Sequence, residues 1–230
     1  GSLSSAGSVS AMPTRPARPE LPQLLAPRLM PRRRTGGVRG RIALLHALAH
    51  IELNAIDLAW DLIGRFGALD WPQAFYQDWV GVAQDEASHF TMLEARLKAL
   101  GARYGELPAH DGLWQAAMAT AHDPLTRLAV VPMVLEARGL DVAPAMIARL
   151  RRAGDDTSAV LLETILREEI RHVAAGARWF GYLCRLRGLP ETKTWRALVA
   201  KHHRGTLKPP FNQAARRASG MASELYEDFA

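Results

Sequence analysis

The chain has 230 residues, of which 48% are hydrophobic and 23% are charged, a composition typical of a globular protein with a sizeable core. No run approaches the roughly 18 uncharged apolar residues of a membrane-spanning helix, so we expect no integral membrane segment. The single cysteine, Cys184, excludes an internal disulfide framework and a thiolate zinc cluster. Without a segment of signal-peptide type, the chain is expected to be cytoplasmic.

Positive charge is concentrated at the two ends of the chain. Residues 1–41 carry +7, residues 193–230 carry +4, and residues 42–192 carry −5. The net charge of +6 would by itself suggest a nucleic-acid-binding protein, but the body of the chain is mildly acidic. Residues 1–37 are rich in Pro, Arg, Ser and Gly and show no apolar periodicity, which predicts an extended arm.

From residue 38 onward, apolar residues recur at helical spacing and strand signals are nearly absent. We therefore predict an all-α domain over 38–230, with a C-terminal extension from about 188. Breaks that contain glycine or proline separate its helices. Four long helices are predicted over 39–66, 72–101, 124–152 and 156–187, with a short helix within 106–122, another over 191–203, and one or two more after an extended turn at 208–212.

The second and fourth long helices each contain a Glu-x-x-His pair, Glu86 with His89 and Glu169 with His172. Residues i and i+3 of a helix project from the same face, and both pairs share that face with apolar residues. A carboxylate among apolar side chains is unfavourable unless it is paired, protonated or bound to a metal. Both pairs are therefore candidate metal ligands.

The first and third long helices each place one glutamate on an apolar stripe, Glu52 and Glu136. The stripes carry no arginine, which argues against buried Glu–Arg pairs. Carboxylate and imidazole ligands together suit iron or manganese, and two bridging carboxylates can hold a metal pair. Glu52 and Glu86 are 34 residues apart, Glu136 and Glu169 are 33 apart, and 50 residues separate Glu86 from Glu136. Two αα-hairpins joined by a long crossover, the ferritin-like four-helix arrangement, fit these intervals.

The order Glu…Glu-x-x-His…Glu…Glu-x-x-His resembles the ferritin-like di-iron carboxylate superfamily. Four stretches resemble an uncharacterised bacterial ferritin-like family within it, a domain of unknown function: HALAHIELNAIDLAWD (46–61), DEASHF (85–90), VPMVLEARGLDVAP (131–144) and KPPFNQAARRASG (208–220). The resemblance covers most of 40–220. It implies two iron ions, with a Mn/Fe pair left open, and bridging roles for Glu86 and Glu169. The ligands that it implies are Glu52, Glu86, His89, Glu136, Glu169 and His172.

Three charged residues adjoin these ligands in the sequence: Asp85, Glu168 and Arg171. Related oxygenases place an acid at the positions of Asp85 and Glu168, where it accepts a hydrogen bond from the far nitrogen of a ligand histidine. Arg171 could pair with either acid. Surface charge is the alternative for all three.

A second group of polar residues lies on another side of the first helix, away from Glu52. We expect these residues to form a polar face, covered by the basic C-terminal tail. They are His46, His50, Asn54, Asp57 and Asp61.

The resemblance leaves three functions open. The first is an oxidase or oxygenase that acts with O₂ or peroxide on a small organic molecule and needs an external electron donor. Gly139, three residues after Glu136, is expected to leave space beside the metals for that molecule. The second is an RNA-modifying hydroxylase of the type that acts on tRNA, with phosphates bound by the basic ends. The third is iron oxidation and storage, which the additions at 102–123 and 188–230 disfavour.

Nucleic acid is the less favoured partner, because the arm has no aromatic residue with which to stack a base. We expect the arginines of the arm to meet acidic helical faces, either of the same domain or of a partner subunit in a homodimer. The residue pattern identifies neither the substrate nor the electron donor.

Overall fold

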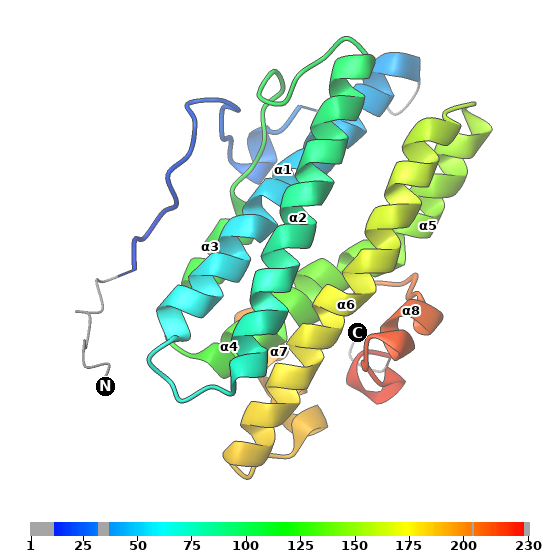
Figure 1. The fold of residues 1–230 in the computed structure, drawn as a ribbon. Helices are drawn as coiled ribbons and strands as arrows, with labels where there is room; N and C mark the ends of the chain where they lie inside the picture. Colours follow the sequence, from blue (N-terminus) through cyan, green and yellow to red (C-terminus); the bar gives the residue numbers. More distant parts are fainter. Residues whose placement is uncertain (1–11, 32–36, 204, 228–230) are drawn as a thin grey trace.

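The computed structural model describes residues 12–31, 37–203 and 205–227, and over these residues the chain is helical without any strand. An isolated bridge pairs Leu24 with Ala109. The predicted all-α class is therefore confirmed. Figure 1 shows two pairs of long helices packed together, with shorter helices near their ends. Parts of the predicted N-terminal arm, 1–11 and 32–36, lie outside the described residues.

The two long hairpins agree with the predicted helices to within a few residues, except in the third stretch. α1 (Gly37–Phe66) packs along α2 (Gln73–Ala99), and α5 (Ala137–Arg152) packs along α6 (Asp156–Leu186). α4 (Pro124–Val130) precedes the second hairpin, and contacts between α2 and α6 join the two pairs. The interior between the pairs is where the candidate ligands lie.

The crossover between the hairpins contains α3 (Gly112–Ala119). It starts at Gly101, whose φ of +79° lies in the left-handed region that glycine adopts without steric cost. It ends at Asp123, which caps α4 by accepting a hydrogen bond from the backbone N–H of Thr126. Pro124 follows at the first helical position, where its missing N–H is not needed.

The third predicted helix, 124–152, is not continuous. The segment Val131–Glu136 is a π-helix between α4 and α5. Pro132 lies in its first turn and has no N–H to donate, which disrupts the α-helical hydrogen-bond pattern. Gly176 of α6 faces this segment, and a Cβ at Gly176 would lie 2.5 Å from Cβ of Pro132. Glycine therefore allows the π segment to approach α6 closely.

The described part of the N-terminal arm lies along the helical domain. Arg15 pairs with Asp111 at 2.6 Å, and Arg18 pairs with Asp57 at 2.6 Å. These two arginines meet acidic side chains of the domain, as we expected for the arm.

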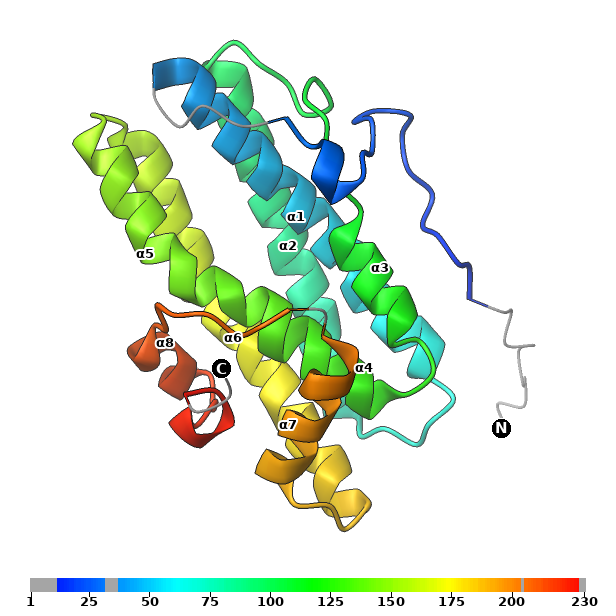
Figure 2. The ribbon, with the colours of Figure 1, turned by 180° about the vertical axis from the view of Figure 1, so that it is seen from behind.

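The C-terminal extension packs into the same core as the second hairpin. α7 (Glu191–His202) follows the predicted helix closely and buries Trp195 and Val199. These side chains share one apolar cluster with Trp179 of α6. Figure 2 shows α7 beside α4, and α8 (Gln213–Ala218) near the second hairpin.

One helix of the described chain, α1, is long and apolar enough to cross a membrane by length and composition alone. Half of its most apolar window is buried inside the structure. The core helix of a folded domain passes the same test, so this property is weak evidence for a membrane span. It does qualify the expectation from the sequence, which required an uninterrupted run without charges.

Candidate metal centre

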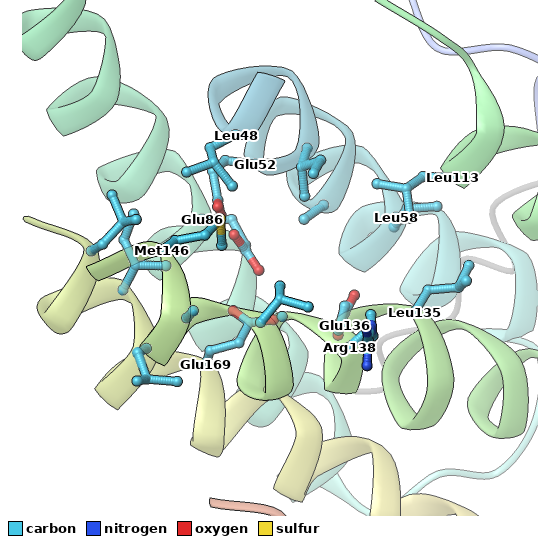
Figure 3. A pocket seen from close by; sticks show the side chains of 18 residues that line it. Leu48, Glu52, Leu58, Glu86, Leu113, Leu135, Glu136, Arg138, Met146 and Glu169 are labelled. Atoms are coloured by element: carbon cyan, nitrogen blue, oxygen red, sulfur yellow. The ribbon is translucent and has the colours of Figure 1, made fainter. Parts of the chain in front are cut away.

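Five of the six side chains predicted as metal ligands come together in two groups in the interior between the two hairpins. The sixth, Glu136, lines the adjacent cavity but belongs to neither group. Both histidines are buried with Glu52 and Glu86, and the remaining two glutamates line the same cavity as Glu52 and Glu86. Figure 3 shows the four glutamates around this cavity, contributed by α1, α2, the π segment and α6. The full set is Glu52, Glu86, His89, Glu136, Glu169 and His172.

Glu86 lies at the centre of this cluster. Its Oε2 is 3.4 Å from Nδ1 of His89, and its Oε1 is 3.0 Å from Nδ1 of His172. Glu86 forms one group with Glu52 and His89, and a second group with Glu169 and His172. In each group the candidate ligand atoms all lie within 4.8 Å of one another. Two adjacent groups that could each hold a metal ion therefore share one carboxylate.

Both histidines are oriented by an acid from the opposite hairpin. Nε2 of His89 donates to Glu168 at 2.9 Å, and Nε2 of His172 donates to Asp85 at 3.1 Å. Because an ionised carboxylate only accepts, each Nε2 carries the proton and each Nδ1 faces the cluster. Arg171 donates in turn to Asp85 at 3.0 Å. The sequence left open whether these three residues were surface charge, and the structure shows these hydrogen bonds.

The glutamates have no arginine or lysine partner among the residues that the structure describes. The ion pairs that they form are with His89 and His172. Three buried atoms of the cluster have no hydrogen-bond partner in this part of the chain: Glu86 Oε2, His89 Nδ1 and Glu136 Oε2. Buried charge without a partner is strongly unfavourable, and a bound cation would remove this cost. The donor set therefore fits metal ions.

The pKa values of the cluster show the same need for positive charge. Burial raises the pKa of Glu52 and of Glu136, and the neighbouring carboxylates raise it further. Burial opposes a charge on His89, but its contacts with Glu52 and Glu86 outweigh burial and raise the pKa of His89 to about 10. The pKa of His172 is likewise raised, because its hydrogen bonds to Glu169 and Glu86 outweigh the effect of burial. Protons here supply the compensation that a cation would otherwise give.

Glu136 enters the cluster from the last position of the π segment. A π turn shifts the register of the residues that follow it and is frequent at functional sites. The apolar stripe of the sequence identified Glu136 as inward-facing, but not the change of helix type. The available signal was Pro132, four residues earlier, inside a stretch that otherwise shows helical periodicity.

The second polar group on α1 is buried, which corrects our expectation of a polar face under the C-terminal tail. The crossover and the N-terminal arm cover it instead. Nε2 of His46 accepts a hydrogen bond from the backbone N–H of Gly105 at 2.9 Å. Arg18 donates to Oδ1 of Asn54 at 3.1 Å. Side chains of this group that are at most 7% exposed are His46, His50, Asn54 and Asp61.

Outside the glutamate cluster, the buried aspartates of the described chain have guanidinium partners. Asp61 is 2.6 Å from Nη1 of Arg127, which is 0% exposed. Asp141 receives two bonds from Arg216, at 2.8 and 2.7 Å. The apolar stripes did not reveal these inward arginines, because Arg127 and Arg216 are separated from their partners by 66 and 75 residues.

A cavity of about 200 Å³ lies against the glutamates. Apart from these glutamates, Arg138 and Gly139, only aliphatic side chains and one methionine line it. Arg138 is partly exposed and donates to the backbone carbonyls of Lys208 and Pro210. A Cβ at Gly139 would meet nothing within 4 Å, so Gly139 does leave space beside the cluster, as predicted.

Comparisons with known proteins identify relatives of this chain but no reaction. The family model described as "Protein of unknown function (DUF455)" matches residues 1–227. An "Uncharacterized protein" of Haemophilus influenzae (strain Rd) is 43% identical over 210 residues, which cover 89% of this chain and 73% of the relative. No solved structure matches the chain.

Proposed function

We propose that this chain, which belongs to the DUF455 family, is a di-iron carboxylate oxidase or oxygenase. It would act with O₂ or peroxide on a small organic molecule. The observation that carries the proposal is a pair of three-residue groups, with three glutamates and two histidines between them, that share Glu86 and face an apolar cavity. A fourth glutamate, Glu136, lines the same cavity. The order of the ligands along two hairpins and a crossover supports a ferritin-like four-helix bundle as the fold.

The two three-residue groups would each hold one metal ion. Glu86 belongs to both groups, which suits a bridging ligand. Glu169 belongs to one of them, so the geometry supports a bridging role for Glu86 more directly than for Glu169. Glu136 would complete the site from the cavity side. The bound pair, Fe/Fe or Mn/Fe, would supply the activation of O₂ or peroxide.

Residues around the cluster would position the ligands and keep water away. Glu168 and Asp85 fix the proton of each ligand histidine on Nε2, which leaves Nδ1 for a metal. Arg171 holds Asp85 in place from the surface side. The aliphatic wall of the cavity offers water few hydrogen bonds, so a substrate can be held there without competing solvent.

Two structural features favour this function over the alternatives. Arg15 and Arg18 of the basic arm already pair with acids of the domain, which leaves less charge for RNA phosphates. The apolar cavity beside the glutamates is suited to an organic molecule, whereas iron storage would need a polar path for hydrated ions. RNA hydroxylation therefore ranks second and storage third.

The decisive experiment is to purify the protein without chelator and measure anomalous scattering at the iron and manganese edges. We expect two metal ions per chain within the cluster, and consumption of O₂ when the iron-loaded protein is reduced. A chain that binds no metal after incubation with Fe(II) and Mn(II) would refute the proposal. Accumulation of many ferric ions per chain would instead favour storage, and a salt-sensitive RNA complex would favour the RNA hydroxylase.

A further inference from the structure

The wall of the cavity has a uniform chemical character. Twelve of its lining residues are Leu, Ile, Val, Ala or Met, contributed by α1, α3, the π segment, α5 and α6. Within the described chain this wall contains no aromatic ring, hydroxyl or amide side chain. Figure 3 shows Leu48 and Met146 on one side of the carboxylates and Leu58, Leu113 and Leu135 on the other. An occupant therefore meets aliphatic groups on both sides of the polar cluster.

The charges at the cavity also restrict the occupant. Its polar groups are the four glutamates and Arg138, and the guanidinium of Arg138 already binds the carbonyls of Lys208 and Pro210. In the metal-free chain, an anionic group deep in the cavity would face carboxylates, and the one guanidinium of the lining is already hydrogen-bonded to backbone carbonyls. An aromatic ring would find no ring to stack against. A neutral aliphatic chain meets neither penalty.

The volume sets the size of that chain. A dry apolar cavity of about 150 Å³ holds benzene, which has six non-hydrogen atoms. At about 200 Å³, this cavity corresponds to roughly eight non-hydrogen atoms by the same proportion. Ile51 lines the cavity and is 43% exposed, so the cavity reaches solvent beside α1. A longer molecule could leave its polar end there.

We propose that the cavity binds a neutral aliphatic chain of about six to eight carbons and presents it to the carboxylate cluster, with Gly139 setting the length that fits. That this chain is a substrate rests on the proposed function, whereas its binding does not. Gly139 lies on α5 among the lining residues, and a side chain there would enter open space. A larger residue at Gly139 would shorten the chain that the cavity accepts.

The test is a series of straight-chain primary alcohols, from ethanol to decanol, titrated calorimetrically into the full chain. Each methylene buried in the cavity adds about 0.8 kcal/mol, or about fourfold in affinity. We expect affinity to rise by this factor up to about six to eight carbons and then to level off. In Gly139→Leu, whose side chain has four carbons, the plateau should move to a chain about three to four carbons shorter.

Gly81→Leu is the matched control, because Gly81 also lies in a helix and has nothing within 4 Å of its Cβ position, but does not line this cavity. Its plateau should stay at the wild-type length. Gly139→Val, with three added carbons, provides a second variant if Gly139→Leu melts at a much lower temperature. Absence of alcohol binding, a series without a plateau, or the same plateau in the Gly139 variants would overturn the proposal.

Metal analysis of the same samples separates this proposal from the proposed function. A wild-type chain that binds alcohols with the expected plateau but binds no iron or manganese keeps the aliphatic site and loses the oxidase or oxygenase. A chain that binds two metal ions but shows no alcohol plateau keeps the metal site of the proposed function and loses the aliphatic site.

Discussion

Two clusters of buried ionisable groups lie on different faces of α1, and they are compensated in opposite ways. Beneath the crossover, Asp61 is 3% exposed and is bound by both Arg127 and Arg65 at 2.6 Å. In the interior of the hairpins, Glu86 is 1% exposed and has only histidines as ionic partners in the described chain. One acid is compensated by arginines of the same chain, and the other is not.

The contrast shows how a structural charge differs from a charge held for a ligand. A buried acid with a guanidinium partner is neutralised as soon as the chain folds, and nothing else needs to bind. In the glutamate cluster, burial and the neighbouring carboxylates raise the pKa of Glu52 and of Glu136, which favours their neutral, protonated forms. The cluster also leaves two carboxylate oxygens and a ring nitrogen without hydrogen-bond partners in the described part of the chain. Substitutions of matched acids in the two clusters should therefore have different consequences.

Removal of a central glutamate should have the largest effect, on metal content. We expect Glu86→Ala and Glu169→Ala to bind no metal and yet to keep their helices, because the apolar stripes pack without the metals and loss of a buried carboxylate relieves its desolvation cost. Circular dichroism and metal analysis of the same samples measure both properties. Collapse of helicity in either variant would show that metal is needed for folding and would weaken the contrast with Asp61.

The same substitution at Asp61 should destabilise the protein instead. Asp61→Ala leaves Arg127 buried without its charge partner, which is expected to cost about 3 to 5 kcal/mol of the free energy of unfolding. Urea denaturation of the metal-free protein would measure this. In Asp61→Leu/Arg127→Met, where the whole pair is replaced by apolar groups, most of the loss should disappear. A change below about 0.5 kcal/mol in Asp61→Ala would mean that the buried pair is not structural.

The two clusters also differ in how far the sequence revealed them. Periodicity identified the glutamate cluster, because each ligand lies on an apolar stripe where a carboxylate is conspicuous, and because Glu-x-x-His repeats at hairpin spacing. Periodicity failed for Asp61, because its partner Arg127 lies 66 residues away and lies outside the stripes used for the prediction. Which loop would cover the polar side of α1 depends on tertiary packing, and no local pattern encodes it.

The ends of the long helices could be predicted from the sequence, but the π segment and the shape of the cavity could not. Glycine, proline and capping residues marked the ends of α1, α2 and α6 to within about three residues. The π segment Val131–Glu136 was missed because its residues keep apolar helical spacing, and only Pro132 signals the disruption. The cavity was anticipated only at Gly139, since the shape of an internal space depends on how side chains of five elements pack together.

The acids behind the histidines should have an intermediate effect, which sharpens the contrast within the glutamate cluster. Glu168→Ala removes the acceptor that orients His89, and loss of such a partner typically weakens metal binding by about 10- to 100-fold. Competition with a chelator of known affinity would measure the change. Glu94→Ala is the control, because the ion pair of Glu94 among the described residues is with Lys98 of the same helix. This variant should leave the affinity unchanged. Equal affinities in both variants would assign Glu168 to surface charge.

The smallest effect concerns the pH dependence of the cluster beneath the crossover. Burial lowers the pKa of His50 from 6.5 to about 4, although a backbone hydrogen bond to His110 opposes this shift. In the neutral ring, Nε2 donates to the carbonyl of His110 at 3.2 Å and Nδ1 can accept from the hydroxyl of Tyr104 at 2.8 Å. Between about pH 6.5 and pH 4 the unfolded chain binds the proton and the folded chain does not. The stabilisation is therefore complete above pH 6.5 and is lost as the pH falls toward 4.

We expect roughly 1 kcal/mol less stability at pH 5 than at pH 7 from this residue, allowing for solvent screening. Urea denaturation of wild type and His50→Gln across this range isolates the contribution, because the other titrating groups are common to both. Parallel stability curves for the two proteins would show that His50 is not held neutral by the fold.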